Sequence, residues 1–277
     1  MFSNPVTVIR VIVMIIGGII AIIGMNKHKQ GAGWGQPLAV IGAIVAIIAA
    51  LWGIKRVVAG DEQKEMRARE FAYQKVQTRM MGKYLAEHFA GKKVVIVKDA
   101  MRYVTIDGDA SKVVDYPLEG LKEGLGSGMT IVKEILPVQA GGNKAPAGAP
   151  AGMPAMMMPQ SMWYTSDMLA KDLPAENTYD IIVFLAGAPT DSLSNRSKVK
   201  DIFKKKKIAL IAGDFRLYPQ LFSTGCAVCA VIYNPKAEYD ESPMPSNDQK
   251  AFDKRFIMLT GDNYQQVIEA NSSLFRM

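Results

Sequence analysis

Short apolar runs alternate with helix-like segments through the second half of the chain. Three runs, Ile181–Ala186, Ile208–Ala212 and Ala227–Tyr233, are apolar at nearly every position, and a glycine follows each of the first two. Strands buried on both faces of a sheet have this continuous apolar character because neither face meets water. The pattern therefore predicts consecutive βα units that build a mainly parallel sheet with helices on both faces.

Further segments are expected to complete this domain, which we place at residues 91–277. A three-layer, flavodoxin-like α/β fold accounts for the alternation of strand-like and helix-like segments. The additional predicted strands are Val94–Val97, Arg102–Ile106, Thr130–Leu136 and Arg255–Leu259. The predicted helices between them include Leu118–Leu125, Trp163–Leu173 and Asp248–Asp253.

Two long apolar stretches open the chain. Val6–Met25 is almost wholly apolar apart from Arg10, and Pro37–Ile54 carries no charge. Each is about long enough to cross a bilayer core of ~30 Å as a helix. We therefore predict that residues 1–57 form a transmembrane helical hairpin in a lipid bilayer. A cleaved signal peptide is the alternative for the first stretch, but no small-x-small cleavage pattern follows Ile23.

Small residues recur along both apolar stretches, as they do where transmembrane helices approach closely. These small-residue faces could pair within the hairpin or between protomers, and we expect pairing within the hairpin. They are Gly17, Ala21 and Gly24 in the first stretch, and Ala39, Gly42, Ala43, Ala46 and Ala50 in the second.

The distribution of basic residues predicts an orientation. Lys27 and Lys29 lie in the connection between the two apolar stretches, whereas five basic residues lie between 55 and 69. Because cytoplasmic flanks are richer in lysine and arginine, we expect two spans in a cytoplasmic (inner) membrane with the C-terminal domain in the cytoplasm.

Two segments differ in composition from their surroundings. Residues 58–90 are rich in Glu, Lys and Arg and are predicted to form a charged stalk helix whose second half docks on the domain. Residues 137–161 are rich in Ala, Gly, Pro and Met, and we expect a flexible insertion there. Methionines in and beside the insertion suggest an adaptable contact surface for protein or lipid, with a soft-metal site as the alternative. They are Met153, Met156, Met157, Met158 and Met162.

The net charge of +7 does not by itself indicate nucleic-acid binding. Many basic residues flank the apolar stretches, and no arginine-rich stripe with interleaved aromatic residues is present, so no nucleic-acid partner is expected. The only two cysteines, Cys226 and Cys229, are three apart on a predicted strand. Their side chains then point to opposite faces, which predicts buried structural thiols without a disulfide, a metal site or a cofactor.

Ligands of open parallel sheets bind beyond the carboxyl ends of the strands, at the point where the strand order reverses. The polar residues and glycines after the predicted strands are therefore candidate binding residues for a small polar ligand. They are Lys98, Asp99, Gly187, Thr190, Asp191, Gly213, Asp214 and Arg216. Two structural alternatives stay open: Asp191 as a helix cap, and Asp214 paired with Arg216.

Several segments between residues 83 and 233 resemble one lobe of the type I periplasmic binding proteins. YLAEHFAGKKVVIVKD resembles the helix and first strand of such a lobe, and LEGLKEGLGSGMTIVKEI resembles the next helix and strand. YDIIVFLAGAPTD and KKIALIAGD resemble the third and fourth strands. The resemblance implies a ligand-binding lobe. The chain departs from the family because about 187 residues are too few for two lobes.

The sequence contains no template for catalysis: GxSxG, GxxxxGK[ST], GxGxxG and HExxH are all absent. We therefore expect a membrane-anchored, non-enzymatic protein whose single α/β lobe contacts a ligand or a protein partner at the strand ends, as a homo-oligomer or with another protein. One alternative is an enzyme of flavodoxin-like fold that uses Asp99, Asp191 and Asp214. The other is a structural membrane scaffold subunit.

Overall fold

The chain divides into two compact units. The computed structural model describes residues 5–58, 61–103, 114–138, 158–190, 203, 205–240 and 242–275. The first unit comprises Met1–Glu70 with Tyr239–Pro243, and the second comprises Phe71–Glu238 with Met244–Met277. Helix α3 therefore begins in the first unit and, from Phe71 onward, belongs to the second.

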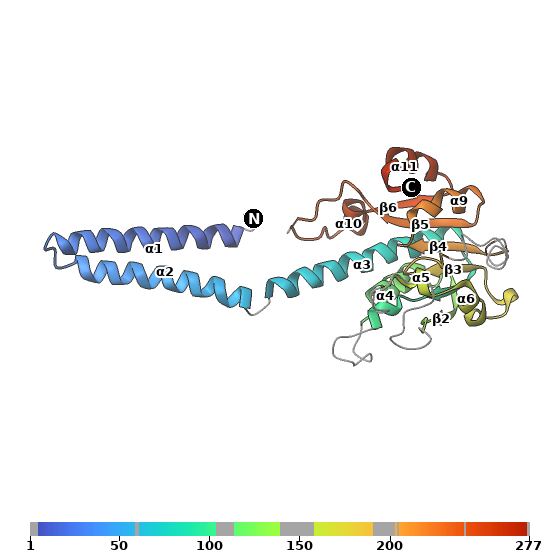
Figure 1. Ribbon diagram of the computed structural model, residues 1–277, viewed down its shortest axis with the longest axis horizontal. Helices are drawn as coiled ribbons and strands as arrows, with labels where there is room; N and C mark the ends of the chain where they lie inside the picture. The colour runs from blue at the N-terminus through green and yellow to red at the C-terminus, as the bar shows by residue number, and fades with distance from the viewer. Residues whose placement is uncertain are drawn as a thin grey trace. The chain divides into compact units, whose positions relative to one another are not determined.

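The described elements alternate between helix and strand through the second unit (Figure 1). The strands are β1 (Lys93–Val97), β2 (Thr130–Ile135), β3 (Ile181–Phe184), β4 (Lys207–Ile211), β5 (Ala227–Tyr233) and β6 (Phe256–Thr260). The α-helices are α1 (Pro5–Lys29), α2 (Gly35–Val58), α3 (Asp61–His88), α4 (Tyr116–Leu125), α5 (Gln160–Trp163), α6 (Ser166–Asp172), α9 (Tyr218–Ser223), α10 (Asp248–Arg255), α11 (Tyr264–Ala270) and α12 (Ser272–Phe275). Short 3-10 helices are η1 (Ala100–Tyr103), η4 (Glu176–Thr178) and η5 (Phe215–Leu217).

The six strands form one sheet in the order β2-β1-β3-β4-β5-β6. Strands β1 to β5 are parallel, and β6 pairs with β5 in antiparallel orientation. The first five follow the 2-1-3-4-5 order of flavodoxin-like folds, in which the strand order reverses between β1 and β3. The predicted mixed α/β fold with a mostly parallel sheet is confirmed.

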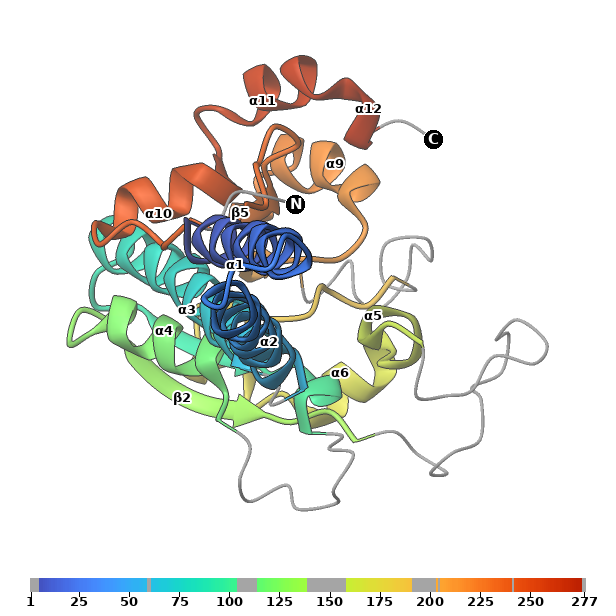
Figure 2. The same cartoon turned by 90° about the vertical axis from the view of Figure 1, so that its left-hand side faces the viewer.

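Helices cover both faces of this sheet, because successive residues of each strand point to opposite faces. On one face, residues such as Ile96 and Val183 pack in a cluster with side chains of α3, α4 and α10. On the other, residues such as Val97 and Phe184 pack with side chains of α5, α6, α9 and the C-terminal helices. Figure 2 shows α3, α4 and α10 together on one side. The core is therefore divided into two apolar layers by the sheet.

The sheet also joins two separate portions of the chain. Strands β1 and β2 and helices α3 and α4 precede residue 139, whereas β3 to β6 follow residue 157. The two portions meet in the sheet along β1 and β3, where Val94–Val97 pair with Ile181–Phe184.

Several predicted boundaries are corrected by the structure. Arg102 and Tyr103 belong to the 3-10 helix η1, so the predicted strand Arg102–Ile106 is wrong there, and its remaining residues lie outside the described ones. The predicted helix Trp163–Leu173 is divided into α5 and α6, because Thr165 caps a new helix by accepting from the Met168 amide. Arg255 ends α10 rather than beginning a strand.

Helices α3 and α4 approach each other closely through glycines. A Cβ added to Gly82 of α3 would lie 2.6 Å from the carbonyl oxygen of Leu121 in α4. One added to Gly124 of α4 would lie 2.9 Å from the Gly82 Cα and closer still to the Arg79 carbonyl oxygen. Only glycine leaves room for backbones at this separation. Ion pairs frame the contact, since Arg79 Nη2 lies 2.7 Å from a Glu123 carboxylate oxygen.

Both edges of the sheet are protected against pairing with another strand. Strand β2 carries a β-bulge opposite Val94 and Val95 and presents Lys133, whose Nζ donates to the Asp172 carbonyl. On β6, the Asn263 carboxamide bonds to backbone groups that would otherwise be open to a neighbouring strand. It donates to the Met258 carbonyl at 2.9 Å and accepts from the Thr260 amide at 2.8 Å.

In the first unit, α1 and α2 lie side by side (Figure 1), and several glycines of each helix lie against the backbone of the other. A Cβ on Gly17 would lie 2.9 Å from the Ala46 amide nitrogen, and one on Gly42 would lie 2.5 Å from that of Ala21. Among the described residues, the α1 segment Val11–Lys29 is long and apolar enough to cross a membrane, and the apolar part of α2, Gly35–Leu51, is shorter.

Candidate functional site

The predicted binding edge lies at the carboxyl ends of β1 and β3, where the strand order reverses. Instead of an open crevice, the short helix α5 occupies this position. Gln160, the first residue of α5, is only 2% exposed. Its carboxamide donates to the Lys98 carbonyl at 2.9 Å and accepts from the Ala100 amide at 2.6 Å. The Gln160 side chain therefore takes up backbone hydrogen-bonding groups of the loop after β1 that a ligand would otherwise meet.

The next residue of α5 holds the loop after β3. The Ser161 carbonyl accepts from the Thr190 amide at 2.9 Å and from the Thr190 hydroxyl at 3.1 Å. Met158 and Trp163, on either side, are buried in the core beneath. Residues Met158–Trp163, which we call the plug, thus bond to both the loop after β1 and the loop after β3.

The plug corrects the predicted insertion at its C-terminal end. Residues 158–161 were expected to be part of a flexible segment, but Met158, Gln160 and Ser161 are buried. Met158 is a core residue, whereas Met162 is 58% exposed. Met153, Met156 and Met157 lie outside the described residues.

The polar residues after β1 are held by local contacts. The Asp99 carboxylate accepts from the Met101 amide at 3.0 Å, which forms a turn. Lys98 Nζ lies 3.9 Å from one carboxylate oxygen of Glu134, and Lys122 Nζ lies 2.6 Å from the other. These contacts do not direct the two side chains toward a shared ligand position.

The two predicted glycines contact each other. Gly187 and Gly213 have φ angles of +81° and +104°, in a region that L side chains rarely adopt. A Cβ on Gly187 would lie 2.7 Å from the Gly213 Cα. Their role in the structure is to let the loops after β3 and β4 touch. Asp191, which follows Thr190, lies outside the described residues, so its predicted role stays a prediction.

After β4, Asp214 pairs with Arg216, which is the structural alternative to ligand binding by these two residues. The Arg216 guanidinium donates two hydrogen bonds to the Asp214 carboxylate, from Nε at 2.7 Å and from Nη2 at 2.6 Å. These bonds hold the pKa of Asp214 below its usual range. A carboxylate kept ionised and bidentately bound is poorly suited to accept a proton from a substrate.

In the described part of the site, each predicted polar residue is held by a partner within the chain, and Asp191 lies outside the described residues. Asp99 and Asp214 each have local partners, and among the described residues no three His, Cys, Asp or Glu side chains lie close enough to hold a metal ion. Sequence reasoning missed Gln160, the residue that fills the crevice. A glutamine beside prolines and methionines carries no local signal of burial.

The two cysteines lie on opposite faces of the sheet, as predicted. Cys226 belongs to one apolar layer and Cys229 to the other, and both are free and buried. Burial raises the pKa of the Cys226 thiol to about 11, so almost none of it is a thiolate at neutral pH.

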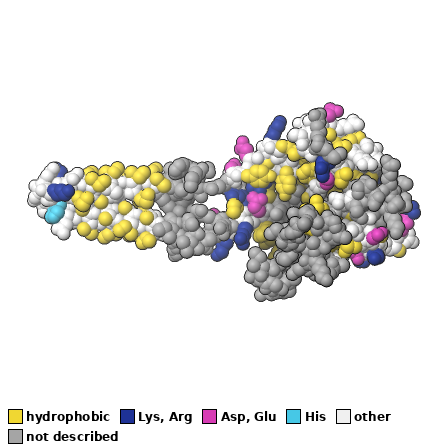
Figure 3. All heavy atoms as spheres, in the orientation of Figure 1, with side chains coloured by type: hydrophobic (Ala, Val, Ile, Leu, Met, Phe, Trp, Pro, Cys, Tyr) yellow, Lys and Arg dark blue, Asp and Glu magenta, His cyan; other side chains and the backbone are white. Residues whose placement is uncertain are grey.

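Large apolar side chains cover the outside of α1 and α2. Figure 3 shows apolar side chains distributed along the visible face of both helices, with white atoms between them. Where burial is described between residues 9 and 51, the buried residues are Gly17, Gly24, Gly35 and Gly42. Ile, Val, Leu and Met side chains of both helices are exposed, including Ile22 at 58% and Leu51 at 58%. A helix pair that folds in water has the opposite arrangement, with its large apolar side chains inside.

Comparison with protein-family models, with curated proteins and with solved structures found no match to this chain. The resemblance to one lobe of the type I periplasmic binding proteins stays a prediction.

Proposed function

We propose that this protein is a membrane-anchored, non-enzymatic interaction protein. In this proposal, α1 and α2 form a transmembrane hairpin and the α/β unit is held at the cytoplasmic surface. The observation that carries the proposal is the arrangement of α1 and α2, with glycines between the helices and large aliphatic side chains outside. Such a surface is stable in lipid, where close packing of small residues joins helices.

The exposed connection between the helices supports the same interpretation. It carries Lys27, His28 and Lys29 at the end of α1 and then Trp34, which is 56% exposed. Tryptophan and lysine are favoured at the boundary between a bilayer and water. Five basic residues follow between 55 and 69, which favours the cytoplasm for the flank after α2.

The closed crevice supports an interaction role over catalysis. Gln160 and Ser161 bond to the loops after β1 and β3, so among the described residues the switch point is occupied by the chain itself. The exposed residues of the plug are Pro159 and Met162, and Met101 of η1, which follows the Ala100 bonded to Gln160, is 37% exposed. Methionine is adaptable and common at protein contact surfaces, so we propose a protein partner, either another protein or a second copy of this chain, at this edge.

Paired reporter fusions test the anchoring. A reporter active only outside the cytoplasm, fused after Met277, should be silent, and the same reporter inserted after Gly33 should be active. A reporter active only in the cytoplasm should give the reverse pattern at both positions. Activity outside the cytoplasm after Met277 would overturn the orientation, and equal activity at both positions would overturn the two-span hairpin.

Site-specific photo-crosslinking tests the contact surface. A photoreactive amino acid at Met162 should give a discrete crosslinked product in membranes. The matched control is Gln249, an exposed residue of α10, which should give none. Equal products at both positions would show non-specific contact and contradict an interaction at the plug.

A further inference from the structure

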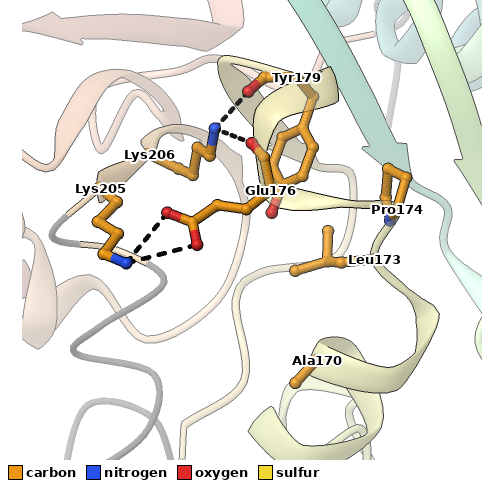
Figure 4. A pocket seen from close by; sticks show the side chains of 7 residues that line it. All are labelled: Ala170, Leu173, Pro174, Glu176, Tyr179, Lys205 and Lys206. Atoms are coloured by element: carbon orange, nitrogen blue, oxygen red, sulfur yellow. Dashed lines mark hydrogen bonds and ion pairs between the residues drawn. The ribbon is translucent and has the colours of Figure 1, made fainter.

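A cavity of about 280 Å³ lies at the amino-terminal ends of β3 and β4, whereas the plug lies at the carboxyl ends of the strands. It is formed where the chain enters β3 and β4, next to the end of α6 (Figure 4). Its apolar lining comes from Ala170, Leu173 and the ring of Tyr179. Its charged lining comes from Lys205, Lys206 and Glu176.

Lys206 places a fixed positive charge in this cavity. Its Nζ donates to the backbone carbonyl of Tyr179 at 2.5 Å and to that of Glu176, and it lies 4.5 Å from the centre of the Tyr179 ring. These partners are uncharged dipoles and a π face, so they orient the ammonium without neutralising it. An ammonium has three N–H donors, and the two carbonyls use two of them.

Lys205 supplies a second cation that is held less firmly. Its Nζ lies 3.2 Å and 3.4 Å from the two carboxylate oxygens of Glu176. The Lys205 and Glu176 side chains are 61% and 59% exposed, and an ion pair this exposed contributes only about 0–1 kcal/mol. An incoming anion can therefore share Lys205 with Glu176 at little cost. Figure 4 shows this ion pair to the left of Leu173 and Ala170.

We propose that the cavity binds a small amphipathic carboxylate. The ligand's carboxylate would accept from the third N–H of Lys206 and from Lys205, and its short apolar group would lie on Ala170, Leu173 and the Tyr179 ring. The volume is at the small end for ligand sites, which are roughly 300–1,000 Å³, so the ligand is a small molecule or a single side chain. This site lies apart from the plug and does not depend on the membrane role proposed above.

The test uses the full chain in detergent and two probes of nearly equal shape, benzoate and the uncharged benzamide. Saturation-transfer NMR should show benzoate binding with a Kd below about 10 mM. Benzamide should bind at least roughly tenfold more weakly, because it lacks the charge that makes hydrogen bonds from lysine strong. Equal affinity for the two probes, or no benzoate binding in this range, would overturn the proposal.

Two variants localise the binding. Lys206→Met removes the fixed cation, and Ala170→Phe fills the cavity from an exposed position on α6. Both should weaken benzoate binding by roughly tenfold or more. Lys171→Met, an exposed lysine of α6 outside the cavity lining, should bind as the unaltered chain does. If Lys206→Met does not fold, Ala170→Phe decides alone, and unchanged benzoate binding in Ala170→Phe would refute this location.

Discussion

The close contact of α3 and α4 makes Gly124 a sensitive position of the α/β unit. In Gly124→Ala, the new Cβ would lie 2.9 Å from the Gly82 Cα and closer to the Arg79 carbonyl oxygen, whereas ordinary contacts begin at 3.4 Å. Both neighbours are backbone atoms, so no side-chain rotation relieves the overlap. The two helices must move apart, which loosens the apolar layer that includes Leu121 and Leu125.

Two opposing terms set the size of the effect. Alanine is favoured over glycine in a helix by about 1 kcal/mol, which would stabilise α4 in isolation. Overpacking a tight contact costs about 1–3 kcal/mol, and more when backbone atoms must shift. Because the obstacle here is backbone on both sides, we expect a net loss of ~2 kcal/mol, or roughly 4–8 °C in the unfolding temperature of a domain this size.

Thermal unfolding of the full chain in detergent, followed by circular dichroism, measures this loss. The matched control is Gly261→Ala in the same unit, where a Cβ would meet no atom within 4 Å. The control should unfold within about 1 °C of the unaltered chain, as isolated surface substitutions do. An unfolding temperature of Gly124→Ala at or above that of the control would refute the close helix contact.

Three other contacts are expected to affect stability measurably. Asn263→Ala should cost about 1 kcal/mol and accelerate hydrogen exchange of the Thr260 amide, since it removes the cap on the β6 edge; unchanged exchange would contradict the cap. Gly17→Ile should lower the unfolding temperature of the α1–α2 helical signal while Gly18→Ile, with no atom within 4 Å of its Cβ, should not. The hydrogen bond from Lys75 holds the pKa of Glu123 below its usual 4.5, so the stability it contributes is present above that pH and is lost as the pH falls through the folded-state pKa. Unfolding between pH 6 and 3 should therefore show a smaller acid-induced loss for Glu123→Gln, and equal losses would contradict the contribution.

The inner strands β1, β3, β4 and β5 were predictable because burial on both faces leaves a continuous apolar run in the sequence. The predicted strand Ala227–Tyr233 matches β5 at both ends. Boundaries shifted where a neighbouring helix used the same residues, as at Arg255. Some of the small residues noted in the sequence, Gly17, Gly24 and Gly42, lie against the backbone of the facing helix, whereas Ala43 is exposed.

The candidate site could be predicted only as a location. The carboxyl ends of β1, β3 and β4 were found from the sequence. Whether they form a crevice depends on Gln160, which bonds to Lys98 although it lies more than sixty positions later in the chain. The composition around Gln160 is typical of a loop, so nothing local indicated a buried carboxamide. The cavity lined by Ala170 and Lys206 was missed for the same reason, since it joins residues from separate elements.

The seam between β1 and β3 has a consequence for a chain that is cut. A break between Val138 and Met158 would give an N-terminal fragment with β1, β2, α3 and α4, and a C-terminal fragment with the other four strands. Each fragment would carry surfaces that only the other completes: the β1–β3 ladder, the Gln160 bonds, and the 2.9 Å ion pair of Arg79 with Asp248. Separately produced halves should therefore reassemble, with a second-order dependence on concentration, and under the anchoring proposed above the half carrying α1 and α2 should recruit the other half to a membrane.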